Sequence, residues 1–108
     1  MSATQLLRLR VAVNERDMHE GKPTYSCLIE YLQSKGIAGA TVCRSIEGFG
    51  ASGILRDERA IDATSSLTLV IESIDEAGRL TPLLDDLQRM MCSGLITVEP
   101  VEIHAPLV

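Results

Sequence analysis

The chain has 108 residues and a formal charge of −5, from ten Lys and Arg against fifteen Asp and Glu. Hydrophobic residues make up 45% and charged residues 23% of it, a composition typical of one globular domain, here expected to span residues 1–108. The acidic balance and the absence of a Lys- and Arg-rich run exclude nucleic acid as the main partner, because phosphate contacts need such clusters.

Two features of the sequence bear on location. The N-terminal apolar stretch is interrupted by Arg8 and Arg10, so it does not resemble a signal peptide, and no apolar run reaches the roughly 18 residues of a membrane helix. The cysteines are odd in number and widely spaced, at Cys27, Cys43 and Cys92. This spacing favours a reducing, cytoplasmic compartment without a disulfide framework. The lack of a long apolar run predicts no direct insertion into a membrane.

The first half of the chain has the pattern of a strand, a helix and a strand. Residues 6–13 ("LLRLRVAV") alternate between apolar and polar, as a half-buried strand does. Residues 24–36 have apolar side chains at helical spacing, with Pro23 suited to the first turn and Gly36 to the C-terminus. A second strand is expected at residues 40–46 ("ATVCRSI").

The stretch after this strand, "EGFGASG", contains three glycines within six residues. It opens a polar segment over about residues 48–65, which is long for a connection between strands, and long connections are usually functional or mobile. Glycine costs conformational entropy on folding, so the cluster indicates either a sharp turn or a close approach to the backbone. A flexible loop base and a binding site both remain open.

The second half of the chain repeats the order of the first. A strand is expected at residues 66–74 and a helix over residues 75–94, with Asp75 as candidate N-cap and Gly94 as candidate C-cap. Pro82 should bend this helix or delay its start. The last strand is expected at residues 95–103 ("LITVEPVEI"), and its proline indicates an edge position or a bulge.

The resulting order, β-α-β, long loop, β-α-β, predicts an α+β fold. Two such units interleave into a ferredoxin-like βαββαβ sandwich, in which two helices cover one face of an antiparallel four-stranded sheet. The third strand is apolar on both faces, because Leu69 and Ile71 alternate with Val70 and Ile74. Since two helices cover only one face, the other should be an interface between subunits.

With the elements placed, a family resemblance becomes visible in "GKPTY", "GIAGATVCRSIEGFGASG", "LVIESID" and "GLITVEPVEI". Together these motifs resemble the P-II-like proteins of domain-of-unknown-function family 190, over about residues 6–104. The resemblance implies a trimer whose three sheets face a central axis, with a T-loop-like segment at about 48–65. It also implies effector binding in the clefts between subunits, where P-II proteins bind adenine nucleotides.

Carried over by position, Thr41, Gly48 and Gly50 match nucleotide-contacting positions of P-II proteins. The two glycines would expose backbone N–H groups that can hold an anion. Arg44 completes the set of candidate binding residues, although an ion pair with a carboxylate of a neighbouring subunit is the favoured interpretation of this side chain.

The sequence departs from the P-II pattern at two places that would meet phosphates. Ala51 stands where P-II proteins have a basic residue, and "CSGL" replaces a phosphate-binding loop rich in glycine and lysine. These departures favour AMP or ADP over ATP, or a different small anion.

Other chemistry finds little support in the sequence. His19 and His104 lie far apart with no third ligand at metal spacing, so we expect no metal site. Cys27 and Cys43 suit buried positions, and no nucleophile with an adjacent base indicates an enzyme.

We therefore expect a non-enzymatic regulatory module that binds a small anionic effector and signals through the loop. The alternative is an effector-free interaction protein that docks on a membrane transporter. Members of the resembled family are often encoded beside, or fused to, fluoride-channel-like proteins.

Overall fold

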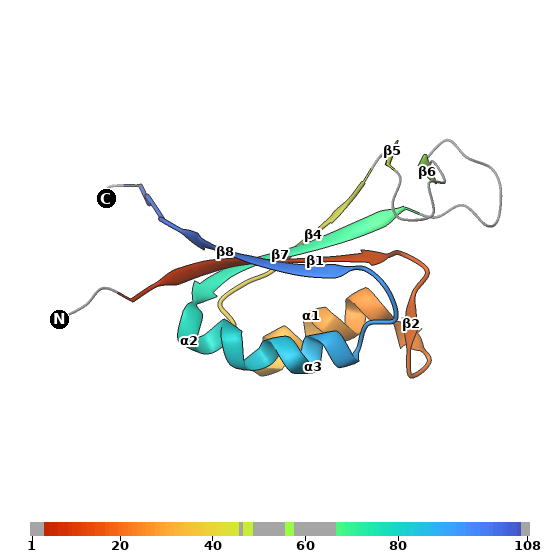
Figure 1. Cartoon of the computed structure of the whole chain (residues 1–108), viewed down its shortest axis with the longest axis horizontal. Helices are drawn as coiled ribbons and strands as arrows, with labels where there is room; N and C mark the ends of the chain where they lie inside the picture. Colours follow the sequence, from red (N-terminus) through yellow and green to blue (C-terminus); the bar gives the residue numbers. More distant parts are fainter. Residues whose placement is uncertain (1–3, 46, 49–55, 58–66, 107–108) are drawn as a thin grey trace.

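The computed structural model describes residues 4–45, 47–48, 56–57 and 67–106 (Figure 1). Its main strands are β1 (Leu6–Asn14), β4 (Thr41–Arg44), β7 (Thr68–Glu76) and β8 (Leu95–Val101). Its helical segments are α1 (Thr24–Ser34), α2 (Ala77–Leu80), the 3₁₀ turn η1 (Thr81–Leu83) and α3 (Leu84–Arg89). Two short ladders complete the described part, β2 (Met18–His19) with β3 (Lys22–Pro23), and β5 (Glu47–Gly48) with β6 (Arg56–Asp57).

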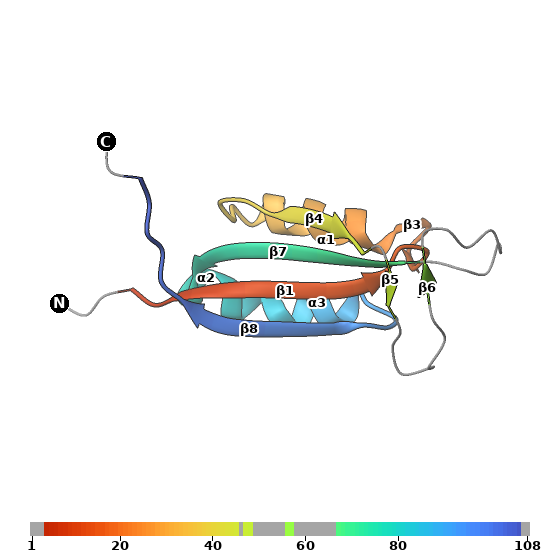
Figure 2. The ribbon, with the colours of Figure 1, turned by 90° about the horizontal axis from the view of Figure 1, so that it is seen from above.

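The main strands form one sheet in the order β4-β7-β1-β8, and each neighbouring pair is antiparallel. Figures 1 and 2 show that α1 and the α2–η1–α3 segment lie on the same side of this sheet. The ferredoxin-like α+β fold expected from the sequence is therefore confirmed. β8 is an edge strand, as Pro100 within it indicated.

The core lies between the sheet and the helices and is aliphatic. β1 contributes Leu9, Val11 and Val13, which alternate with exposed or half-buried residues as the sequence predicted. α1 adds Leu28 and Leu32 from its expected apolar stripe. The second helical segment buries three leucines in the same cluster, namely Leu80, Leu83 and Leu87.

The ends of α1 follow the sequence signals closely. Pro23 occupies the N-cap, one residue before the first turn, and Gly36 lies just past the C-cap with φ +75°. This left-handed conformation is the one in which glycine ends helices.

The second helix differs from its prediction at both ends. Asp75 is not its N-cap, because β7 continues to Glu76, which occupies that position, and the buried Asp75 carboxylate accepts hydrogen bonds instead. Gly94 is not its C-cap, because α3 already ends at Arg89. Pro82 lies in η1, so the expected interruption by proline is confirmed.

The face of the sheet without helices, here called the open face, carries charge among its apolar residues. On β7, Val70 is half-buried and Ile74 is 37% exposed, with Glu72 between them. The Glu72 carboxylate lies 3.4 Å from Arg10 Nε and 3.9 Å from Arg8 Nη1. The oligomeric interface expected on this face remains a prediction.

Among the described residues, no helix is long and apolar enough to cross a membrane.

Candidate functional site

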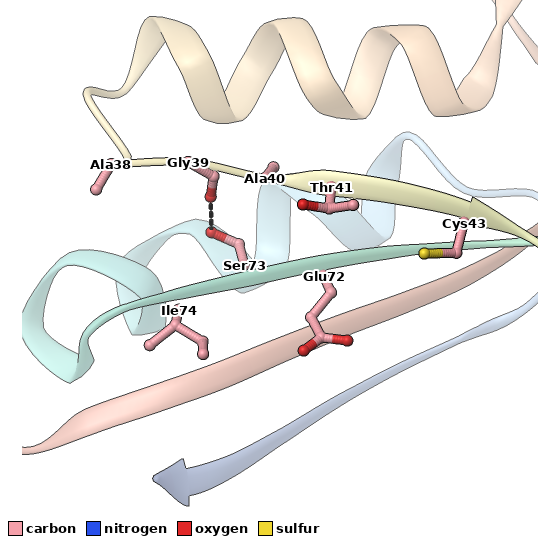
Figure 3. Close-up of a pocket in the computed structure, with 8 residues that line it drawn as sticks. All are labelled: Ala38, Gly39, Ala40, Thr41, Cys43, Glu72, Ser73 and Ile74. Carbon is pink, nitrogen blue, oxygen red and sulfur yellow. Dashed lines mark hydrogen bonds between the residues drawn. The ribbon is translucent and has the colours of Figure 1, made fainter. Parts of the chain in front are cut away.

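A groove of about 640 Å³ runs beside β4 at the edge of the sheet (Figure 3). Its lining combines the connection that leads into β4 with alternate residues of β4 and the end of β7. The lining residues are Ala38, Gly39, Ala40, Thr41, Cys43, Glu72, Ser73 and Ile74. Every residue of β4 is exposed, so in one chain nothing covers this edge strand.

Thr41 is the predicted site residue that lies in this groove. It is opposite Glu72 in the antiparallel register, and residues directly opposite each other in a sheet share one face. The groove therefore offers a hydroxyl group and a carboxylate next to the apolar side chain of Ile74. Such a mixture suits a ligand with a flat apolar body and polar edges.

Arg44 is on β4 but does not line the groove. Its Nε donates to Glu15 Oε2 at 2.7 Å and its Nη2 to Glu15 Oε1 at 3.3 Å. The ion pair favoured from the sequence is present, but its carboxylate comes from the same chain. Arg44 is opposite Leu69, a core residue, so it extends from the face of β4 opposite to Thr41.

Glu15 joins the two parts of the chain that flank the T-loop-like segment. Besides Arg44, its carboxylate accepts the Leu67 N–H at 3.0 Å. The hydrogen bond from Arg44 is the main cause that lowers the pKa of Glu15, and the Leu67 N–H adds to it. Ser45 adds two hydrogen bonds between the same two parts of the chain, since its N–H donates to Thr68 O and its Oγ accepts the Thr68 N–H.

The glycines of the candidate set are only partly covered by the described residues. Gly48 belongs to β5, where its backbone pairs with Arg56 of β6. This short ladder inside the expected loop was not predicted. Gly50 lies outside the described residues, so the anion-holding arrangement of the two glycines stays a prediction.

The cysteines and histidines form no site that the described residues support. No group of three or more metal-ligating side chains comes together within the described ranges. Cys27, Cys43 and Cys92 are free thiols. Cys43 is exposed on the open face, so its predicted burial is wrong for the single chain, because an edge strand has a neighbour on one side only.

The groove residues Glu72 and Ser73 were missed from the sequence. Both stand between the apolar run "LVI" and Ile74 in the third strand, and a polar residue at a core-facing position such as Ser73 needs a hydrogen-bonding partner. That interruption was the available signal. It does not show which backbone segment supplies the partner.

With this geometry described, comparison with known proteins identifies the family. The sequence model of DUF190 ("Uncharacterized ACR, COG1993") matches residues 6–103. The chain belongs to this family. The resemblance inferred from the motifs is thereby confirmed.

Relatives agree with this assignment. A "UPF0166 protein" of Aquifex aeolicus is 38% identical over 95 residues, which cover 88% of this chain and 90% of that protein. A UPF0166 protein of Methanocaldococcus jannaschii is 27% identical over 97 residues, covering 89% of each.

Solved structures with this fold include CPII, a nitrogen regulatory PII-like protein from Thiomonas intermedia K12. One CPII structure, bound to ADP, AMP and bicarbonate, superposes with a TM-score of 0.65 at 16% identity, covering 95% of this chain and 97% of that one. A second, bound to ADP and bicarbonate, gives a TM-score of 0.60 at 16% identity, with 92% and 88% covered. At this identity the likeness establishes the fold.

Proposed function

We propose that this DUF190 protein is a non-enzymatic P-II-like regulatory module, one domain over residues 1–108, that binds AMP or ADP. The observation that carries the proposal is the groove around Thr41, which lies at a sheet edge in a fold shared with a protein solved with ADP and AMP. The hydroxyl of Thr41 and the carboxylate of Glu72 can hydrogen-bond the edge of an adenine ring, while Ile74 contacts its face.

A homotrimer would complete this groove. In a single chain the groove is bounded by β7 and by an edge strand whose residues are all exposed. A neighbouring subunit seated on the open face would supply the missing side and cover Ile74 and Leu95, which are 37% and 58% exposed. The effector would then bind at a site that only the assembled trimer completes.

Signalling would pass through the T-loop-like segment at about 48–65. The Glu15–Arg44 ion pair joins the strand that enters this segment to Leu67, which follows it. An effector that extends from the groove to Gly48 or Gly50 would act next to this ion pair, and ordering of a loop is a common switching device. A free-thiol protein of this kind suits the cytoplasm.

Selectivity should favour AMP and ADP over ATP. Charge-assisted hydrogen bonds contribute roughly 1.5–3 kcal/mol each, and the sequence lacks the basic residue and the phosphate loop that would supply them to a third phosphate. Losing two such bonds weakens triphosphate binding by roughly a hundred-fold or more.

Isothermal titration calorimetry with AMP, ADP and ATP, each with and without bicarbonate, tests the proposal. We expect heat with AMP or ADP and weaker binding of ATP. The Thr41→Val variant should bind roughly tenfold or more weakly, because it keeps the shape of threonine and removes the hydroxyl. Thr81→Val, at an exposed position of η1 that does not line the groove, is the matched control and should bind as the wild type does.

The absence of heat with every adenine nucleotide would contradict the proposal and leave the effector-free, transporter-docking alternative ahead. Unchanged binding in Thr41→Val would contradict the placement of the site while leaving nucleotide binding itself intact.

A further inference from the structure

The wall of the effector groove is a segment without regular structure. Residues 37–40, between α1 and β4, belong to no helix or strand. Three of them, Ala38, Gly39 and Ala40, line the groove of about 640 Å³ on one side. The same three line a second hollow of about 260 Å³ against α1 on the other side, where Ile29 and Gln33 face them. Ile37, just before them, is packed in the core. Since open space lies on both sides of residues 38–40, here called the wall, packing alone does not fix their position.

Three polar side chains from β7 and α2 hold this wall instead. Ser73 Oγ donates to Gly39 O at 2.5 Å (Figure 3). Asp75 Oδ2 accepts the Ala38 N–H at 3.0 Å. Arg79 Nη2 donates to Gly36 O, at the point where the chain leaves α1.

Ser73 and Asp75 are buried polar side chains that find hydrogen-bonding partners in the wall. Ser73 and Asp75 are 3% and 7% exposed, although they follow the core residues Leu69 and Ile71 on the helix-covered face of β7. A buried hydroxyl or carboxylate there costs free energy unless it is hydrogen-bonded, and backbone atoms of the wall supply partners for both. Arg79 Nη1 also lies 3.7 Å from Asp75 Oδ1, which joins the members of the set.

We propose that Ser73, Asp75 and Arg79 are positioning residues of the effector site, which fix Gly36 and the wall that follows it so that Thr41 faces the ligand. The inference rests on the proposed function, since it concerns the same groove. Without these hydrogen bonds, the segment could shift into either neighbouring hollow, and the entry into β4 would move with it. Loss of Arg79, which does not line the groove, would then lower ligand affinity without the loss of a group that contacts the ligand.

Calorimetry with ADP, combined with amide hydrogen exchange, tests this role. Ser73→Ala should bind ADP roughly tenfold more weakly and exchange the amides of residues 38–41 faster, with exchange in β1 unchanged. Ser73→Thr keeps the hydroxyl and should restore affinity to within about twofold of the wild type. A merely stabilising residue would change the melting temperature without this pattern.

Two further variants make the test robust. Ser34→Ala is the matched control, because Ser34 Oγ also donates to a backbone carbonyl, that of Tyr31 at 2.7 Å, but does not line the groove. Arg79→Ala removes a side chain that is 46% exposed, so it tests the wall without disturbing the core. It should also weaken ADP binding and speed exchange at residues 38–41.

The possible failures are distinguishable. If wild-type protein binds ADP and both Ser73→Ala and Arg79→Ala bind it equally well, the positioning role is overturned and the proposed function stands. If wild-type protein binds no adenine nucleotide, the proposed function fails and the positioning role fails with it.

Discussion

At the scale of single residues, Gly94 is, of the five glycines compared in the described part of the chain, the one where a side chain is least tolerable. Its φ is +95°, and a Cβ built there would lie 1.9 Å from Ala12 O, a backbone atom of the central strand β1. Gly94→Ala should therefore destabilise the fold by about 2–5 kcal/mol, from left-handed strain of about 1–2 kcal/mol and the displacement of β1. Urea unfolding followed by circular dichroism measures this loss.

Gly21→Ala separates the two causes of that loss. Gly21 also has a positive φ, +81°, but nothing lies within 4 Å of a Cβ there. This variant should lose only the strain, about 1–2 kcal/mol. Equal losses at the two positions would show that the contact with Ala12 does not matter.

Asp75 gives a residue-scale prediction in pH. The Ala38 N–H is the main cause that holds its pKa below the ordinary value of 3.8, with the Glu76 N–H and the Arg79 charge adding to it. A lowered folded-state pKa means that the carboxylate stabilises the fold above the ordinary pKa. This stabilisation is lost as the pH falls through the folded-state value.

The difference in unfolding free energy between wild type and Asp75→Asn should therefore shrink as the pH falls from about 5 to 3. Subtracting the variant's unfolding free energy from that of the wild type at each pH removes the contributions of Glu15 and Asp86, whose pKa values are also lowered. A difference that stays constant over this range would refute the assignment.

At the scale of elements, one hydrogen bond ties α1 to α3. Tyr31 Oη donates to Asp86 Oδ2 at 2.6 Å. Burial, with the Asp86 hydrogen bond and charge adding to it, raises the pKa of Tyr31 to about 12. Because the folded-state value is the higher one, the bond stabilises the fold below the ordinary value of 10.0 and is lost as the pH rises towards about 12.

An absorbance titration in a Tyr25→Phe background, which leaves Tyr31 as the only tyrosine, should give a midpoint of about 12. Adding Asp86→Ala should move that midpoint down towards 10.0 but not fully, because burial remains. A midpoint that does not respond to Asp86→Ala would show that α3 makes no such bond in solution.

The elements themselves were largely predictable because their apolar periodicity matches their burial. The stripe of Leu28 and Leu32 and the alternation of β1 identify faces that the core then covers. Glycine and proline marked the end of α1, the break at Pro82 and the edge strand β8. The β2–β3 hairpin was missed, because a two-residue ladder carries no periodicity.

The groove was less predictable, because it depends on contacts that are remote in sequence. Thr41 was found through the family motif, but no local pattern shows that Ser73 bonds Gly39, 34 residues away. Asp75 lies one residue before the N-cap of α2, so in the sequence it resembles an N-cap. Only the position of Ala38 in the folded chain shows that the Asp75 carboxylate accepts a hydrogen bond from the wall instead.

At the scale of the whole molecule, Val70 and Ile71 are adjacent on β7 but belong to opposite faces. Ile71 is fully buried under the helices, and Val70 is half-buried on the open face. If the open face is the interface of a trimer, a charge at Val70 meets the neighbouring subunits, whereas a charge at Ile71 meets only the chain's own core. The same substitution at the two positions should then have different consequences.

Wild-type protein should be a monodisperse trimer at micromolar concentration in light scattering, and Val70→Asp should give a folded monomer. An uncompensated carboxylate in a desolvated interface opposes association, but in a single chain it remains partly hydrated on the open face. Ile71→Asp should instead lose its native circular dichroism spectrum, because the carboxylate replaces a fully buried side chain. A wild-type monomer, or a Val70→Asp variant that remains trimeric, would show that the open face is not the interface. The groove beside β4 would then have to bind its ligand within one chain.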